Sequence, residues 1–160
     1  FANDLDGRKS ISGYVFKAGS GSITWRSKKQ NVVAKSTVEA EYIAGSDSCS
    51  EALWIRSVFH ELDIDDLNIP IYQDNQGAIA LSRNSGFHNR SKHIDVAHHF
   101  VKDYVAKGFV STIYVPTESQ TADIFTKALP KSIFVKFRAA LGLEHVGTTD
   151  ERKTTQDEGK

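Results

Sequence analysis

The 160-residue sequence contains one cysteine, no methionine and three prolines, and it carries no excess charge of either sign. The single cysteine, Cys49, excludes a disulfide framework within the chain, so we expect a reducing intracellular compartment. Because 20 basic residues balance 20 acidic ones, the chain cannot bind nucleic acid through bulk charge and needs a local patch. No apolar run approaches the ~18 residues of a membrane span, so we expect no membrane partner.

The absence of methionine bears on how the chain is produced. The chain starts at Phe1 without a signal-peptide pattern. We therefore expect a processed product or a piece of a polyprotein rather than a complete reading frame.

What is present fits a globular domain, with 39% hydrophobic and 25% charged residues. Residues that favour β-strands lie on either side of a glycine-containing loop. They predict a hairpin over residues 12–17 and 22–26. Alternating patterns further along predict strands at 70–73 and 109–115, and helices at 37–62, 76–82, 94–106, 119–129 and 133–141. This order favours an α/β fold in which helices cover a mixed sheet.

Two details of this prediction concern the long helix and the end of the chain. Ser36 and Glu39 form a capping-box pattern that starts the helix. Its buried face is expected to contain five large apolar residues, Trp54, Ile55, Val58, Phe59 and Leu62. Residues 144–160 are almost without apolar side chains, which predicts a domain over residues 1–143 followed by a disordered tail.

Three acidic residues occupy places where such folds build sites. Glu41 lies in the first turns of the long helix, Asp74 where a strand gives way to a helix, and Asp123 near the start of a late helix. Carboxylates that converge from separate elements suit a hard cation such as Mg²⁺. On spacing alone, the favoured interpretation of each acid is a residue that caps or stabilises a helix N-terminus.

Other polar residues suggest a surface for nucleic acid. The segments 26–35 and 83–93 are basic and could contact phosphates, although each patch alone is also typical of solvated surface. The candidates for phosphate contacts are Lys28, Lys29, Arg83, Arg90 and Lys92. A zinc site is not favoured, because His93 and His98 are five positions apart and no second cysteine is present.

Several longer motifs occur in unbroken order across residues 1–143. They are residues 8–16 (RKSISGYVF), 23–30 (ITWRSKKQ), 36–44 (STVEAEYIA), 71–79 (IYQDNQGAI), 92–96 (KHIDV), 114–117 (YVPT) and 122–129 (ADIFTKAL). Together they resemble the ribonuclease H domain of Ty1/copia-type retrotransposon polyproteins.

The resemblance implies a ribonuclease H-like fold, with a five-stranded mixed sheet flanked by helices and a first strand truncated at the N-terminus. It also implies an endonuclease that cleaves the RNA strand of RNA–DNA hybrids during reverse transcription. Glu41, Asp74 and Asp123 resemble three of the family's four catalytic carboxylates, which would hold two Mg²⁺ or Mn²⁺ ions. The fourth acid would lie three residues upstream of Phe1.

The resemblance further implies a partner and a location. A reverse transcriptase domain is expected N-terminal in the same polyprotein, and the protein is expected in a cytoplasmic virus-like particle or in the nucleus. Choosing RNA over DNA requires contacts to 2′-hydroxyl groups, for which Asn75 and Gln76 are candidates.

Two alternatives remain open at the level of sequence. One is a catalytically incomplete nucleic-acid-binding or tethering module of a reverse transcriptase polyprotein. The other is an integrase or transposase on the same fold, against which the motifs at residues 36–44 and 117–127 speak.

Overall fold

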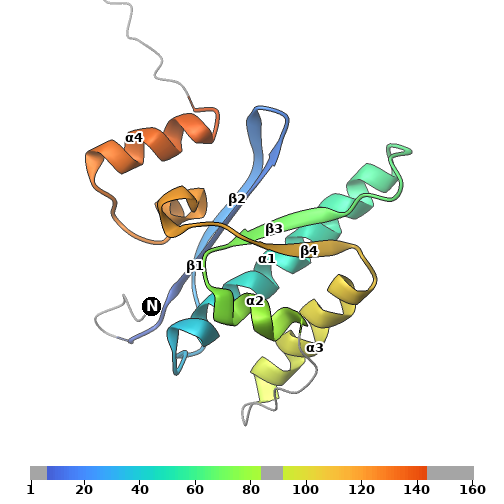
Figure 1. The fold of residues 1–160 in the computed structure, drawn as a ribbon, viewed down its shortest axis with the longest axis horizontal. Helices are drawn as coiled ribbons and strands as arrows, with labels where there is room; N and C mark the ends of the chain where they lie inside the picture. The colour runs from blue at the N-terminus through green and yellow to red at the C-terminus, as the bar shows by residue number, and fades with distance from the viewer. Residues whose placement is uncertain (1–6, 84–91, 144–160) are drawn as a thin grey trace, which may run out of the picture.

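A computed structural model describes residues 7–83 and 92–143, which form a mixed α/β arrangement (Figure 1). The long helix α1 passes behind two separate pairs of strands, and α4 lies on the other side of the strands from α2 and α3. The strands are β1 (Ile11–Ala18), β2 (Gly21–Lys29), β3 (Ile69–Gln73) and β4 (Val110–Tyr114). The α-helices are α1 (Thr37–His60), α2 (Gln76–Arg83), α3 (Lys92–Ala106) and α4 (Lys131–Ala140).

The predicted hairpin is confirmed and is longer than expected. β1 and β2 pair antiparallel from Ile11 opposite Lys29 to Ala18 opposite Gly21. The turn between them needs a left-handed residue, which Gly19 supplies at φ 61°. One face of the hairpin rests on α1, where Glu51 accepts a hydrogen bond from Thr24 Oγ1 at 2.6 Å. The hairpin is therefore fixed to the long helix by polar contacts.

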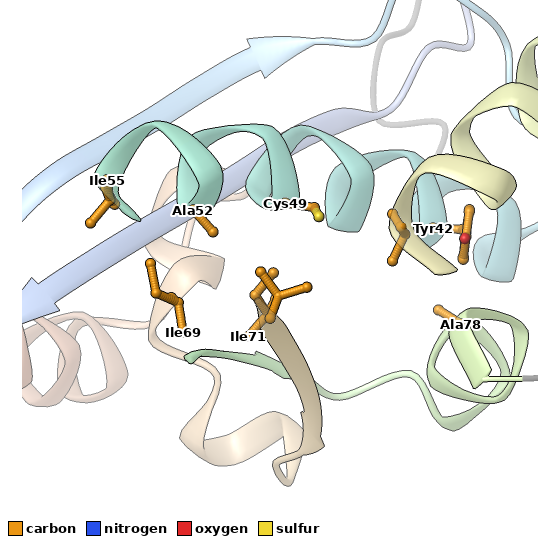
Figure 2. Close-up of a cluster of buried hydrophobic side chains, with 9 residues drawn as sticks. Tyr42, Cys49, Ala52, Ile55, Ile69, Ile71 and Ala78 are labelled. Atoms are coloured by element: carbon orange, nitrogen blue, oxygen red, sulfur yellow. The ribbon is translucent and has the colours of Figure 1, made fainter. Parts of the chain in front are cut away.

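β3 and β4 form a parallel pair, with Ile69 opposite Val110 and Gln73 opposite Tyr114. α2 and α3 supply the crossover that a parallel pair requires. α1 packs on this pair through Cys49, Ala52 and Ile55, which face the β3 side chains drawn in Figure 2. The buried cluster consists of Tyr42, Cys49, Ala52, Ile55, Ile69, Ile71, Ala78, Val101 and Val110.

The predicted buried face of α1 is largely wrong. Trp54, Val58 and Leu62 are 59%, 37% and 64% exposed, while Ile55 is buried and Phe59 packs at the edge of the core. Small residues make much of the buried face instead, and at Gly45 the space above the helix is taken by the Gln73 side chain of β3. A Cβ atom at Gly45 would lie 2.3 Å from Gln73 Nε2. Gly45, Ser48 and Cys49 therefore belong to the packing surface of the helix.

The capping box is confirmed. Ser36 Oγ accepts a hydrogen bond from Glu39 N at 3.1 Å. The Glu39 carboxylate reaches back to Lys35 N at 2.7 Å, one residue before the cap. The Glu39 carboxylate therefore stabilises the first turn of α1, as the capping-box pattern predicted.

The predicted helix at 119–129 is wrong. The segment folds as two short 3₁₀ helices, η1 (Thr117–Ser119) and η2 (Thr121–Phe125). Gln120 separates them with a ψ of 89°, outside the helical range. Its side chain donates from Nε2 to Tyr72 O at 3.1 Å, so the break anchors this segment across the end of β3.

The five-stranded sheet is not present in the described residues, whose strands form two separate two-stranded sheets. A cavity of about 260 Å³ lies where residues 13–17 of β1 and 69–73 of β3 face each other. The expected first strand and the expected tail at 144–160 fall outside the described residues. None of the described helices is long and apolar enough to cross a membrane.

Candidate functional site

The three predicted acids line one surface hollow of about 110 Å³. Glu41 comes from the first turns of α1, Asp74 directly follows β3, and Asp123 lies in η2. The chain turns sharply after Asp74, because Asn75 Oδ1 accepts a hydrogen bond from Ala78 N at 3.1 Å and so caps α2. The structure thus brings together carboxylates that are more than thirty positions apart in sequence.

Asp123 reaches the hollow because η2 lies directly on β1. The contact is at Gly13, where a Cβ atom would lie 2.7 Å from Thr126 Cγ2 and 3.0 Å from Phe125 Cβ. Ser27 Oγ also donates to Phe125 O at 2.6 Å. The hairpin therefore sets the position of η2, and with it the position of Asp123.

The acids interact electrostatically. Glu41 is exposed on the surface of α1. Partial removal of its carboxyl from water raises its pKa above the ordinary value of 4.5, and the negative charges of Asp74 and Asp123 raise it further. Lys127 opposes this shift with its positive charge. The hollow therefore concentrates negative charge that it does not fully compensate.

The repulsion among the three carboxylates predicts that Glu41→Gln raises the melting temperature in a pH-dependent way. A carboxyl whose pKa is raised on folding binds protons better in the folded state, so wild-type stability falls as pH rises through that pKa. The metal-free variant should therefore melt at a higher temperature than wild type at pH 7. The gain should vanish below the ordinary pKa of 4.5, where both states are protonated. Thermal melts in chelator at pH 4 and pH 7 check this, and an equal gain at both pH values would contradict it.

Two further residues of the hollow were not singled out by sequence. Gln30 is buried and donates from Nε2 to Ser12 Oγ at 2.9 Å and Ala40 O at 2.8 Å, which ties the hairpin to α1. Lys127 places its ammonium 2.6 Å from Asp123 Oδ2. The spacing of Asp123 and Lys127, four positions apart, is the sequence signal that could have identified this pair.

The donor chemistry of the hollow suits a hard divalent cation, because all three acids offer carboxylate oxygens. The arrangement is nevertheless incomplete. No three His, Cys, Asp or Glu side chains of residues 7–83 and 92–143 are grouped so that they could hold a metal ion. The three acids share a hollow without forming a closed set of ligands.

The predicted nucleic-acid contacts are distributed over several elements. Lys28 and Lys29 are exposed at the end of β2, and Gln76 is exposed at the first position of α2. Asn75 is engaged in capping α2. Arg83 ends α2 and Lys92 begins α3, but their side chains lie outside the described part of the chain, as does Arg90 altogether.

Comparison with known proteins places the chain in a class. It is 39% identical over 142 residues to the retrovirus-related Pol polyprotein from transposon TNT 1-94 of Nicotiana tabacum. It is 40% identical, over 147 and 144 residues, to the Pol polyproteins from transposons RE1 and RE2 of Arabidopsis thaliana. These matches cover 89%, 91% and 89% of the chain.

The chain is therefore homologous to a segment of retrovirus-related Pol polyproteins from transposons. This confirms the predicted relation to Ty1/copia-type retrotransposon polyproteins. The chain spans only 11%, 10% and 10% of the length of these three relatives. No family model and no solved structure matches the chain.

Proposed function

We propose that the chain is the ribonuclease H domain of a retrotransposon Pol polyprotein, an endonuclease that cleaves the RNA strand of RNA–DNA hybrids during reverse transcription. The observation that carries this proposal is the convergence of Glu41, Asp74 and Asp123 on one hollow. Homology to retrovirus-related Pol polyproteins from transposons supports it, because the sequence motifs predicted the same class of polyprotein. The products would carry 3′-hydroxyl and 5′-phosphate ends.

The proposal includes a ribonuclease H-like fold in which a fifth strand joins the two observed sheets. Ser10 O accepts from Gln30 N, so alternate β1 residues, including Gly13 and Val15, direct their backbone groups away from β2. On β3, Ile69 N donates to Phe109 O and Gln73 O accepts from Val115 N. Tyr72 therefore directs its backbone groups away from β4. These two edges pair with no further strand among the described residues, although Tyr72 O accepts from Gln120 Nε2. Both edges line the same 260 Å³ cavity, which an extended segment upstream of Phe1 would fill.

This fifth strand would also complete the site. The acid expected three residues before Phe1 would supply the fourth carboxylate, which explains why three acids alone do not form a closed ligand set. A chain extended by the preceding segment of its polyprotein should therefore melt at a higher temperature. The Val15 and Tyr72 amides should become protected from hydrogen exchange in the extended chain. Unchanged exchange at both amides would contradict the proposed strand.

In the proposed reaction, Glu41, Asp74 and Asp123 would hold two Mg²⁺ or Mn²⁺ ions. The metals would supply an activated water and compensation for charge developing on the phosphate and the leaving oxygen. Asp74 directly follows β3 and lines the hollow with the other two acids, and it is our candidate for the central metal ligand. The cap at Asn75 holds the backbone next to Asp74 in place.

Hybrid binding is assigned to the basic and polar residues around the hollow. Lys28 and Lys29 extend from the end of β2, the same strand whose Ser27 binds η2. Gln76 and Asn75 lie next to Asp74, where contacts to a 2′-hydroxyl would select RNA. Arg83, Arg90 and Lys92 would extend the same phosphate-binding surface.

The salt dependence of binding tests this assignment. Each phosphate contact releases counterions, so the double variant Lys28→Ala/Lys29→Ala should bind hybrid more weakly and with a salt slope shallower by about 1–2. Lys107→Ala is the matched control, because Lys107 is exposed at the far end of α3 and pairs with Asp103 at 2.6 Å. Fluorescence anisotropy at several salt concentrations measures the slope. An equal loss in both variants would contradict the proposed surface.

The proposal also covers partners and location. A reverse transcriptase domain would precede this domain in the polyprotein and deliver the hybrid to it, within a virus-like particle or the nucleus. The lengths of the relatives, about ten times that of the chain, leave room for such a domain.

A second function is favoured by one observation, the absence of a closed metal-ligand group in the described residues. On that reading the chain is a non-catalytic nucleic-acid-binding or tethering module. A cleavage assay separates the two functions. The extended chain in Mg²⁺ should cut the RNA of a labelled hybrid and leave duplex DNA and single-stranded RNA intact. Hybrid binding without any cutting would favour the tethering module.

A further inference from the structure

The side chain of Lys127 lines the same hollow as the three carboxylates. Its Nζ atom lies 2.6 Å from Asp123 Oδ2, and the Asp123 side chain is only 17% exposed. Among the described residues that line the hollow, Lys127 carries the one positive charge, against the three carboxylates of Glu41, Asp74 and Asp123. The hollow therefore has a cation of its own, supplied by the chain.

The effect of Lys127 extends beyond its direct partner. Its positive charge also acts on Glu41, against the negative charges of Asp74 and Asp123. η2 holds the pair in register, because Lys127 N donates to Asp123 O at 3.2 Å and Thr126 Oγ1 donates to the same oxygen at 3.2 Å. Backbone geometry thus keeps the ammonium at the hollow.

We propose that Lys127 is the resident counter-ion of the hollow and competes with divalent metal for the Asp123 carboxylate. This inference rests on the proposed function, since it assumes that the acids bind metal. In the metal-free state the ammonium pairs with Asp123 and relieves the repulsion among the acids. A divalent cation must take Asp123 from the ammonium, and two cations of 1+ and 2+ charge close together repel each other. Lys127 is therefore a positioning residue that sets how tightly metal is held.

The test uses the chain extended by the preceding segment of its polyprotein, which supplies the fourth acid, with Lys127→Met, which removes the charge and keeps most of the length. Lys127→Arg preserves the charge. Lys107→Met is a matched control, because Lys107, directly after α3, forms an i, i+4 pair of the same 2.6 Å length with Asp103, away from the hollow. Melting temperatures are measured in chelator and then over a Mg²⁺ or Mn²⁺ titration, with circular dichroism to confirm folding.

Two results are expected. In chelator, Lys127→Met should melt at a lower temperature than both wild type and Lys107→Met, because three carboxylates are left uncompensated. In the titration, Lys127→Met should reach its midpoint at a metal concentration about three- to tenfold lower than wild type. Lys127→Arg and Lys107→Met should remain near wild type in the titration.

The outcomes separate this inference from the proposed function. A metal midpoint in Lys127→Met that equals or exceeds that of wild type, while wild type responds to metal and the extended chain cuts hybrid, would overturn the counter-ion alone. No metal response in wild type and no cleavage by the extended chain would overturn the nuclease and the counter-ion together. A chelator melt of Lys127→Met identical to that of Lys107→Met would also overturn it.

Discussion

Asp74→Asn is expected to abolish cleavage of the hybrid by the extended chain, with a fall in rate on the order of 10³ or more, equivalent to about 4 kcal/mol of activation free energy. Asparagine keeps the shape and one oxygen of the side chain but removes the negative charge. A ligand without charge cannot compensate the repulsion between two dications held close together. Single-turnover cleavage of a labelled hybrid in Mg²⁺ measures the loss.

Asp66→Asn is the matched control for this change. Asp66 lines a different surface hollow, near the C-terminal end of α1, that shares no residue with the hollow of the three acids. Its φ of 57° is a conformation that asparagine accepts readily. This control should cleave at the wild-type rate. Retention of full activity by Asp74→Asn would remove Asp74 from the reaction.

Gly13→Ala should damage both stability and activity, although residue 13 carries no chemistry. The added Cβ would lie 2.7 Å from Thr126 Cγ2 and 3.0 Å from Phe125 Cβ, so η2 must move away from β1. Overpacking of this kind costs about 1–3 kcal/mol of folding free energy. Because η2 carries Asp123, the shift should also reduce cleavage more than the loss of stability alone explains.

Chemical denaturation and cleavage rates measure these two effects, and the structure supplies both a control and a rescue. Gly21→Ala is the control, because a Cβ there meets nothing within 4 Å and φ is not positive. Thr126→Ser removes the methyl group that lies closest to the new Cβ while keeping the hydroxyl that binds Asp123 O. The double variant Gly13→Ala/Thr126→Ser should recover part of both losses. Wild-type behaviour of Gly13→Ala would show that η2 does not depend on this contact.

The sequence predicted those parts of the fold that local patterns determine. The hairpin, the capping box at Ser36 and the limits of β3 follow from residues close together in the chain, and the structure confirms them. Predictions that depended on distant neighbours failed. Trp54 and Leu62 have helical spacing, but which face of α1 is buried depends on the close approach of β3 at Gly45. Periodicity alone does not contain that distance.

The candidate site shows the same division. Position at the ends of elements identified Glu41, Asp74 and Asp123, and the structure places all three on one hollow. The helix expected around Asp123 failed because Gln120 leaves the helical conformation to bind Tyr72 O, a partner 48 positions away. Gln30 entered the site only through contacts between different elements, whereas the pairing of Lys127 with Asp123 has a local signal in its i, i+4 spacing. Whether the acids bind metal stays a prediction.

The parallel pairing of β3 and β4 has a consequence for the order in which the molecule folds. The hairpin closes through a turn at Gly19, whereas Ile69 must meet Val110 across the whole of α2 and α3. Loop closure is slower for such distant pairs, so the hairpin and helices should form first and β3 should settle late. Asp74 directly follows β3. The three acids would therefore come together only in the last stage of folding, after the hairpin and the helices have formed.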